Sequence, residues 1–365
     1  MKRVLIYIGH PAQYHFLKNS ICILEENGCD IKVLIKTKDI LEQLLNEDEI
    51  EYTNIQPTPR GKAHFSILIA SIKRTLAVIK EAKRFKADIL VGTDSSVAQA
   101  AFILRRHSIT VLEDDYDIIR NLARLTYPFT SCILVPVECK TGPYTRKRIS
   151  YNGYMKLAYL HPNYFTPDGS VIRKYGLHKK YILIRLAQLS AHHDVNIKGL
   201  TYKSVEDIIT LAENFDYRVY ITSEAVIADG LSSYELKIRY NDIHHVLSHA
   251  SILISDSQSM SMEAAMLGVP SLRFSDFAGR ISVLEELEHS YGLTFGISTN
   301  NPTKLINKLE ELLSISNLKD DFIFRRQKML ADKIDVTAFL TWFIDNYPES
   351  KKIMKKNPAY QSRFM

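Results

Sequence analysis

The chain has 365 residues, 46% of them hydrophobic and 24% charged, and its formal net charge is +6. This composition excludes a disordered or low-complexity protein, and the length favours two domains over a single core. No run approaches the roughly 20 apolar residues that a membrane-spanning helix needs. The apolar stretch at 4–8 is short and ends at Gly9-His10-Pro11, which predicts a first strand rather than a signal peptide.

Strand-like and helix-like segments alternate along the first half of the chain. Short apolar runs predict buried parallel strands at 2–9, 30–35, 50–55, 87–91, 110–112 and 132–135. The stretches between them predict helices at 14–26, 65–85 and 95–106. This alternation is typical of a parallel sheet covered by helices on both faces.

The pattern restarts after residues 165–169, Phe-Thr-Pro-Asp-Gly, because Pro, Asp and Gly break regular structure. Strands are predicted at 181–186, 217–221, 251–255 and 270–274, and helices at 205–212, 243–250, 259–267 and 336–347. We therefore predict an α/β protein with Rossmann-like domains at 1–168 and 169–335, and a C-terminal helix and basic tail at 336–365 that pack back. Two doubly wound domains are expected to face a cleft, where ligands bind beyond the strand ends.

The cysteines, at positions 22, 29, 132 and 139, show no CxxC spacing. Three of them lie in or beside apolar runs, which is typical of reduced thiols in a core. We therefore expect a cytoplasmic protein.

Residues 251–270 carry the strongest chemical signal, because a buried strand runs through a small polar loop directly into a helix. Backbone N–H groups at such a helix start attract a diphosphate. The candidate ligand-binding residues are Asp256, Ser257, Ser259, Met260, Ser261 and Glu263. An ordinary capped helix, with Ser257 or Ser259 as the cap and Glu263 as a favourable charge, explains the same pattern.

This segment resembles the donor-binding Asp-Ser/Gly…Glu-Ala…Leu-Gly-x-Pro motif of glycosyltransferase-B (GT-B) proteins and of non-hydrolysing UDP-N-acetylglucosamine 2-epimerases. Over nearly its whole length the chain resembles a prokaryotic domain-of-unknown-function family within the GT-B superfamily. The likeness includes Gly9-His10-Pro11, Tyr159-Leu160-His161-Pro162, Arg185 with Ala191-His192-His193-Asp194, and residues 256–270. It implies the two-domain GT-B architecture and a nucleotide-sugar ligand, whereas fold likeness alone does not settle the reaction.

Five further positions in the second half are candidates. Arg185 follows a buried strand and is suited to a bidentate contact with phosphate, although an ion pair explains it too. His192 and His193 are candidates for a base or for phosphate contacts, and a solvated loop is the alternative. By resemblance, Ser223 and Glu224 approach the nucleotide base or ribose.

In the first half, Gly9, His10 and Gln13 form a candidate acceptor or phosphate loop, with His10 as a candidate base. The segment is not a GxGxxG fingerprint, so a dinucleotide cofactor is not predicted. Gly153 and Lys156 are added to this loop set, for close backbone approach and phosphate contact, although a structural turn explains them equally.

Asp94 and Glu113 follow neighbouring predicted strands. The 2-epimerases carry catalytic carboxylates at similar places, so both residues are candidate catalytic groups. Glu113 is not followed by the Ala-Gly-x-Arg of those enzymes, which weighs against an epimerase. Helix capping by these acids is the alternative.

Basic and histidine-rich segments invite three further interpretations. His244, His245 and His249 are expected to point away from the core, and because no ligand set is complete, no metal is expected.

Between Arg60 and Lys86 lie eight Lys or Arg and one acid, Glu81. A surface helix explains this segment, and peripheral contact with the inner membrane face is the alternative. No nucleic-acid module is recognisable.

The leading function is a metal-independent glycosyltransferase that uses a nucleotide-diphosphate sugar in surface polysaccharide or glycoconjugate biosynthesis. Its acceptor is an unknown glycan or a lipid-linked acceptor, and no cofactor is expected. The alternative is a nucleotide-sugar 2-epimerase or hydrolase, and the third hypothesis is a non-catalytic nucleotide-sugar-binding protein.

Overall fold

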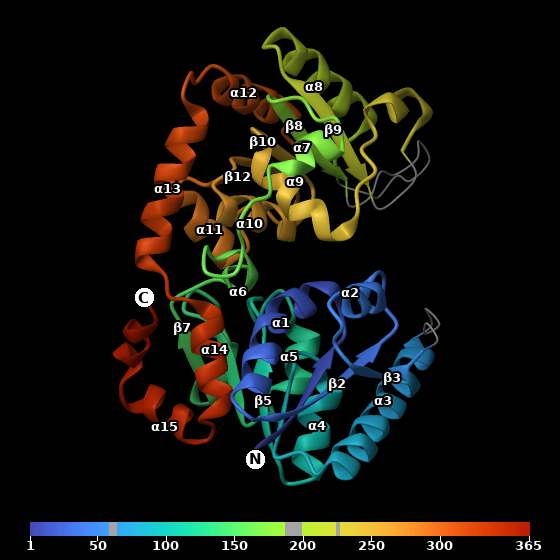
Figure 1. The fold of residues 1–365 in the computed structure, drawn as a ribbon, viewed down its shortest axis with the longest axis vertical. Coiled ribbons are helices and arrows are strands. Elements are labelled where there is room, and N and C mark those ends of the chain that lie inside the picture. Colours follow the sequence, from blue (N-terminus) through green and yellow to red (C-terminus); the bar gives the residue numbers. More distant parts are fainter. Residues whose placement is uncertain (58–63, 187–198, 224–226) are drawn as a thin grey trace. The chain divides into compact units, whose positions relative to one another are not determined.

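The computed structural model describes residues 1–57, 64–186, 199–223 and 227–365. The chain divides into two compact units (Figure 1). Unit 1 combines Met1–Tyr164 with Asp332–Met365, and unit 2 is Phe165–Ala331. Each unit holds one parallel sheet flanked by helices, which confirms the predicted pair of Rossmann-like folds.

Unit 1 is built on a seven-stranded sheet in the order β3-β2-β1-β4-β5-β6-β7. The strands are β1 (Arg3–Ile8), β2 (Asp30–Lys36), β3 (Tyr52–Gln56), β4 (Ile89–Gly92), β5 (His107–Val111), β6 (Cys132–Pro136) and β7 (Arg148–Tyr151). Every neighbouring pair is parallel. The chain moves outward from β1 to β3 and returns past β1 to β4, so the carboxyl ends of β1 and β4 flank a topological switch point.

The helices of unit 1 cover both faces of this sheet. They are α1 (Pro11–Glu26), α2 (Leu41–Glu47), α3 (His64–Phe85), α4 (Ser95–Ile103), α5 (Arg120–Thr126), α6 (Leu157–Leu160), α14 (Val336–Asp345) and α15 (Glu349–Lys356). Helix α14 lies beside α1, so the end of the chain completes this unit (Figure 1). Buried side chains join the sheet to α3 and α4, among them Leu5, Tyr7, Leu90, Val78 and Val97.

Unit 2 is built on a five-stranded sheet in the order β12-β11-β10-β8-β9. Its strands are β8 (Tyr181–Leu186), β9 (Arg218–Ser223), β10 (Ile252–Ser255), β11 (Ser271–Phe274) and β12 (Thr294–Ile297). The helices are α7 (Ser170–Lys174), α8 (Tyr202–Asn214), α9 (Ile243–His249), α10 (Gln258–Leu267), α11 (Ser282–His289), α12 (Pro302–Leu313) and α13 (Leu318–Asp332). The switch point of this sheet lies between β8 and β10.

Helix α1 and strand β7 are among the elements of unit 1 that differ from the sequence prediction. Helix α1 begins at Pro11, three residues before the predicted start, because His10 caps it and proline suits the first helical position. Strand β7 lies at the edge of the sheet, alternates half-buried with buried residues, and therefore lacks an apolar run. Among the helices in the described ranges, none is both long and apolar enough to cross a membrane.

Candidate functional site

The candidate site of unit 2 lies where β8 and β10 end side by side. Ser255 of β10 pairs in register with Arg185 of β8, and its Oγ donates a 2.9 Å hydrogen bond to the Arg185 carbonyl. The Ser255 Oγ also accepts the Ser257 N–H at 2.9 Å. Arg185 is half-buried at this strand end. Arg185 and the loop that starts α10 therefore share the edge where open α/β sheets bind ligands.

Ser257 is the N-cap of α10, and its Oγ accepts the Met260 N–H at 3.4 Å. This settles which of the two serines caps the helix. Asp256 and Ser259 are half-buried beside the cap. The N–H groups of the first turn have no carbonyl of their own helix to bond, and the helix dipole adds positive potential there, so this turn is suited to an anion.

The other predicted residues of α10 face inward. Ser261 is fully buried and donates from Oγ to the Ser257 carbonyl at 3.1 Å. Met260 is 8% exposed and Glu263 is 7% exposed. Glu263 Oε2 lies 3.6 Å from His244 Nε2 of α9. These three side chains therefore hold α10 in place, whereas Asp256, Ser257 and Ser259 lie closer to solvent.

The expectation that the histidines of α9 point away from the core is wrong for His244, which is 8% exposed and lies beside Glu263. His245 stacks near Phe165 at 4.8 Å between ring centroids, and its Nδ1 accepts the Asp168 N–H at 3.0 Å. These contacts tie the start of unit 2 to α9. Across the described ranges, no group of three His, Cys, Asp or Glu side chains is arranged to hold a metal ion.

Three predicted residues lie outside the described residues: His192, His193 and Glu224. Ser223 is described, and it is the half-buried last residue of β9. Strand β9 pairs with β8, with Ser223 opposite Leu186. Ser223 therefore lies at the same sheet edge as Arg185.

The candidate site of unit 1 lies at the carboxyl ends of β1, β4 and β5, which are neighbours in the sheet. His10 follows β1, Asp94 follows β4 and Glu113 follows β5. The sheet order therefore brings together three predicted residues that are distant in sequence. The first two flank the switch point of this sheet.

His10 is the N-cap of α1, and its Nδ1 accepts the Ala12 N–H at 3.2 Å. Beside it, the Gln13 Oε1 accepts the Gly9 N–H at 2.8 Å, which closes the loop. The His10 ring reaches solvent, yet desolvation by the surrounding protein lowers its pKa, and only Asp39 opposes the shift. A neutral ring that accepts at Nδ1 carries its proton on Nε2, so His10 is suited to donate a hydrogen bond rather than to act as a base.

Asp94 is the N-cap of α4, and its Oδ1 accepts three hydrogen bonds. That oxygen accepts from the Ser96 N–H at 2.9 Å, from the Ser96 Oγ at 2.8 Å and from Arg74 Nε at 3.2 Å. Within the described part of the chain, Oδ2 has no such hydrogen bond. The cap and the Arg74 ion pair therefore fix the orientation of the carboxylate.

Glu113 is buried together with Lys156. Its Oε1 accepts the Met155 N–H at 2.6 Å, and its Oε2 lies 3.6 Å from Lys156 Nζ. Desolvation raises the pKa of Glu113, and Lys156 opposes that shift. Lys156 is 7% exposed, so its ammonium serves Glu113 instead of reaching outward from a turn.

Gly153 is explained by packing. A Cβ at this position would lie 2.6 Å from Val336 Cγ2 of α14. The Gly153 N–H donates to the Tyr151 carbonyl at 3.1 Å, which forms a tight turn. Gly153 therefore lets α14 approach β7, and the close backbone approach is to the chain itself.

No family model matches the chain, and no curated protein matches it in sequence. Solved structures match it over nearly its full length. The fold is that of the UDP-N-acetylglucosamine 2-epimerases.

Three matches show the extent of the likeness. S. aureus MnaA, solved with UDP, has a TM-score of 0.67 at 14% identity, over 96% of this chain and 98% of that chain. The UDP-GlcNAc 2-epimerase from Neisseria meningitidis, solved with UDP-GlcNAc, has a TM-score of 0.66 at 17% identity, over 91% and 100%. The glycotransferase of kitacinnamycin has a TM-score of 0.60 at 12% identity, over 94% and 98%.

Sequence reasoning missed Arg273, which connects β11 to the start of α10. Its guanidinium is fully buried, and Nη1 donates to Gln258 Oε1 at 3.3 Å. Its Nη2 lies 3.6 Å from both Glu285 and Glu288 of α11. Burial lowers the Arg273 pKa, and the two glutamates oppose that shift. The signal that could have identified Arg273 is its charge, because it lies within the apolar run of a predicted strand.

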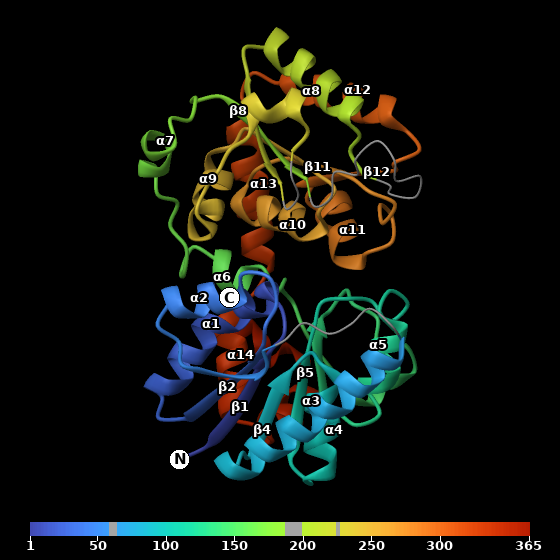
Figure 2. The same cartoon turned by 90° about the vertical axis from the view of Figure 1, so that its right-hand side faces the viewer.

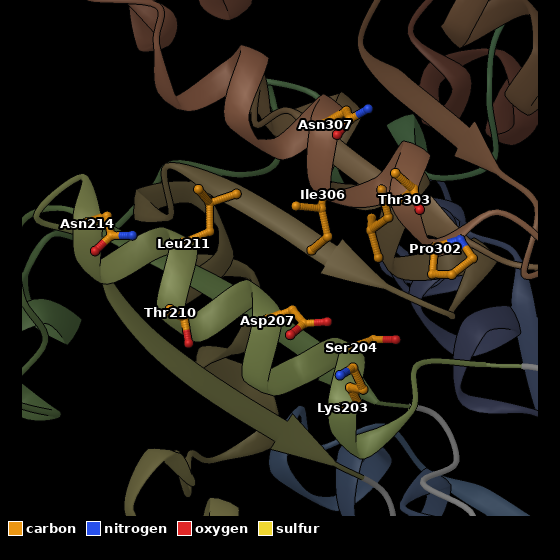
Figure 3. A pocket seen from close by; sticks show the side chains of 11 residues that line it. Lys203, Ser204, Asp207, Thr210, Leu211, Asn214, Pro302, Thr303, Ile306 and Asn307 are labelled. Carbon is orange, nitrogen blue, oxygen red and sulfur yellow. The ribbon is translucent and has the colours of Figure 1, made fainter.

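A separate groove of about 570 Å³ lies between α8 and α12 (Figure 3). Its lining includes Lys203, Ser204 and Asp207 of α8 and Thr303 and Ile306 of α12. None of its lining residues comes from the start of α10 or from a strand end. The groove is therefore distinct from the predicted ligand-binding residues.

Proposed function

We propose that this chain is an enzyme acting on a UDP-sugar, with 2-epimerase-type chemistry as its reaction. Unit 2 binds the diphosphate at the first turn of α10, with Arg185 as the cationic partner. Unit 1 supplies acid–base groups from the carboxyl edge of its sheet. The ligand class is supported by the epimerase fold and by the UDP and UDP-GlcNAc bound in two of the matched structures.

The observation that carries the reaction is the pair of carboxylates that follow the neighbouring strands β4 and β5. Asp94 offers an unbonded Oδ2 within a fixed cap, and Glu113 has a raised pKa. A carboxyl whose pKa is raised by burial holds its proton more readily, and a carboxylate fixed by a helix cap is held in position to take part in proton transfer. Two carboxyls with different environments are therefore suited to remove and return a proton.

The chemistry balances as an elimination followed by an addition. A carboxylate removes the proton from C2 of the sugar, and the C–H electron pair forms a C1=C2 double bond. The C1–O bond breaks, and UDP leaves with that electron pair. Protonation of C2 on the opposite face and return of a diphosphate oxygen to C1 give the epimer. The positive first turn of α10 stabilises the charge on the departing diphosphate.

Glycosyl transfer is the second candidate, and one sequence feature favours it. Glu113 is followed by Asp114-Asp115-Tyr116, and the Ala-Gly-x-Arg of the 2-epimerases is missing. In that reaction an acceptor hydroxyl attacks C1, a carboxylate takes its proton and UDP leaves. Water as the acceptor gives hydrolysis.

Incubation of the protein with UDP-GlcNAc in D₂O separates these reactions by proton NMR. An epimerase exchanges the C2 proton for deuterium and forms the C2 epimer without an acceptor. A hydrolase releases UDP without exchange, and a transferase turns over only when an acceptor glycan is added. Absence of exchange together with acceptor-dependent release of UDP would replace the epimerase proposal with glycosyl transfer.

The binding half of the proposal has its own measurement. Arg185→Gln is expected to weaken UDP binding roughly tenfold or more by calorimetry, since a charged hydrogen bond to phosphate is lost. Arg218→Gln is the matched control, because Arg218 is exposed at the opposite, amino end of the neighbouring strand β9. Equal affinities in the two variants would place the diphosphate elsewhere.

A further inference from the structure

The outward face of α3 combines exposed apolar and basic side chains. Ile72 is 53% exposed, Leu76 is 60% exposed and Ile69 is 37% exposed. Steps of three and four residues along a helix stay on one face, so the same stripe continues through Lys73, Lys80 and Lys83. Figure 2 looks onto this helix, which crosses the outside of unit 1. These six residues are called the α3 stripe below.

The inward face of α3 packs against the hydrophobic core of unit 1. Val78 and Ala82 are buried in the core with strand residues such as Leu5 and Leu90. Arg74, also on the inward side, is paired with Asp94. The apolar residues of the α3 stripe are therefore additional to the core, and an exposed apolar patch of this kind marks an interaction surface.

The charge of the stripe is uniformly positive. Lys73, Lys80 and Lys83 are exposed. Glu81, the acid in this part of the helix, forms its ion pair with Lys32 of β2, at 2.8 Å. The hydrogen bond from Lys32 is the largest influence on the Glu81 pKa and lowers it, although desolvation opposes that shift. Glu81 therefore stays ionised and paired with Lys32 of β2.

The adjoining helix repeats the same composition at its end. Phe102 and Ile103 of α4 are each 61% exposed, and the exposed Arg105 and Arg106 follow them. Helix α4 packs against α3, and Gln99 Oε1 accepts the Thr75 hydroxyl at 3.2 Å between the two helices. Apolar residues next to cations thus recur on neighbouring helices of one face of the sheet.

We infer that the α3 stripe binds the surface of an anionic lipid bilayer. Ile72 and Leu76 insert between the headgroups, while the lysines contact lipid phosphates. Such binding needs both an apolar face and flanking cations, and the stripe supplies both. Nucleic acid would use the lysines and leave Ile72 and Leu76 in water, so it fits the surface less well.

Sedimentation with lipid vesicles tests this inference on the whole protein. We expect binding to vesicles of equimolar phosphatidylcholine and phosphatidylglycerol, weak binding to phosphatidylcholine alone, and release at high salt. The triple variant Lys73→Gln/Lys80→Gln/Lys83→Gln should weaken partitioning about 100-fold, at about fivefold for each cation near the surface. Ile72→Asn/Leu76→Asn should weaken it about tenfold or more with the charge unchanged.

Two control variants separate a specific surface from general stickiness. Phe324→Asn removes an apolar residue that is 68% exposed on α13, and Lys355→Gln/Lys356→Gln removes exposed cations of α15. Both should bind vesicles like the wild type. The inference is overturned if the stripe variants bind like the wild type, if the controls lose binding equally, or if phosphatidylcholine vesicles bind as well as anionic ones. UDP affinity and circular dichroism confirm that each variant is folded.

Discussion

Glu113 and Lys156 form a buried ion pair in unit 1, with Oε2 and Nζ 3.6 Å apart and each side chain 9% exposed. The carboxylate follows β5, and the lysine lies on the segment between β7 and α6. Desolvation raises the pKa of Glu113 while Lys156 opposes the shift. Burial and Lys156 are therefore the two largest influences on the pKa of a candidate catalytic carboxyl.

Lys156→Met should raise the Glu113 pKa further, because the buried carboxylate loses its counter-charge. Removal of one partner from a buried pair costs about 3–5 kcal/mol of stability. Urea unfolding at neutral pH measures this loss. The double variant Glu113→Gln/Lys156→Met should recover much of it, since no charge is then left unpaired. A double variant as unstable as Lys156→Met would show that the two residues are not coupled.

The raised pKa of Glu113 also predicts a dependence of stability on pH. A carboxyl with a higher pKa in the folded than in the unfolded state favours folding when protonated. That contribution is complete below about pH 4.3, the ordinary glutamate value, and is lost as pH rises through the folded-state pKa. Relative to Glu113→Gln, the wild type should therefore lose stability from about pH 4.3 upward, then level off. Parallel curves for the two proteins would contradict the raised pKa.

His10 caps α1 through Nδ1, and we propose that its Nε2 donates a hydrogen bond to the substrate. His10→Asn should preserve the cap, because asparagine is a strong N-cap, whereas His10→Ala should lose about 1 kcal/mol of stability. Both should reduce turnover of the UDP-sugar roughly 10²-fold or more if the ring acts in the reaction. Thermal unfolding and rates measured by NMR distinguish the roles. Normal turnover in His10→Asn would reduce His10 to a helix cap.

Much of the fold follows from local sequence, because buried strands are short apolar runs. Strand β8 begins and ends where the pattern predicts, and the order of strands and helices up to β11 is largely recovered. Strand β7 is not predicted from an apolar run, because this edge strand buries only alternate side chains. The sheet edge that carries the predicted site residues also follows, since parallel strands place their carboxyl ends together.

The inward or outward direction of polar side chains does not follow from local sequence. Glu263 lies one turn into α10, as the sequence predicts, but its side chain is 7% exposed and lies beside His244 of α9. Their contact joins two helices, and periodicity along one helix does not reveal such a partner. Arg273 is similar, because its partners come from α10 and α11.

Gly153 offers a test of a packing role. Gly153→Ala should destabilise unit 1 by about 1–3 kcal/mol, because the added methyl group overlaps Val336. Val336→Ala in the same chain should recover part of that loss by making room. Urea unfolding of the two single variants and the double variant gives the coupling energy. Additive losses would show that the glycine is required for something other than the approach of α14.

Asp94 distinguishes a helix cap from a catalytic carboxylate through its two oxygens. Asp94→Asn retains an oxygen that accepts from Ser96, but it removes the charge and the free carboxylate Oδ2. We expect UDP binding within about twofold of the wild type, because binding rests on unit 2, and turnover lower by about 10²–10⁴-fold. Ser96→Ala is the control, because it loses one hydrogen bond to Oδ1 and leaves Oδ2 unchanged. If Asp94→Asn turned over normally while Glu113→Gln did not, proton transfer would rest on Glu113, and Asp94 would serve α4 alone.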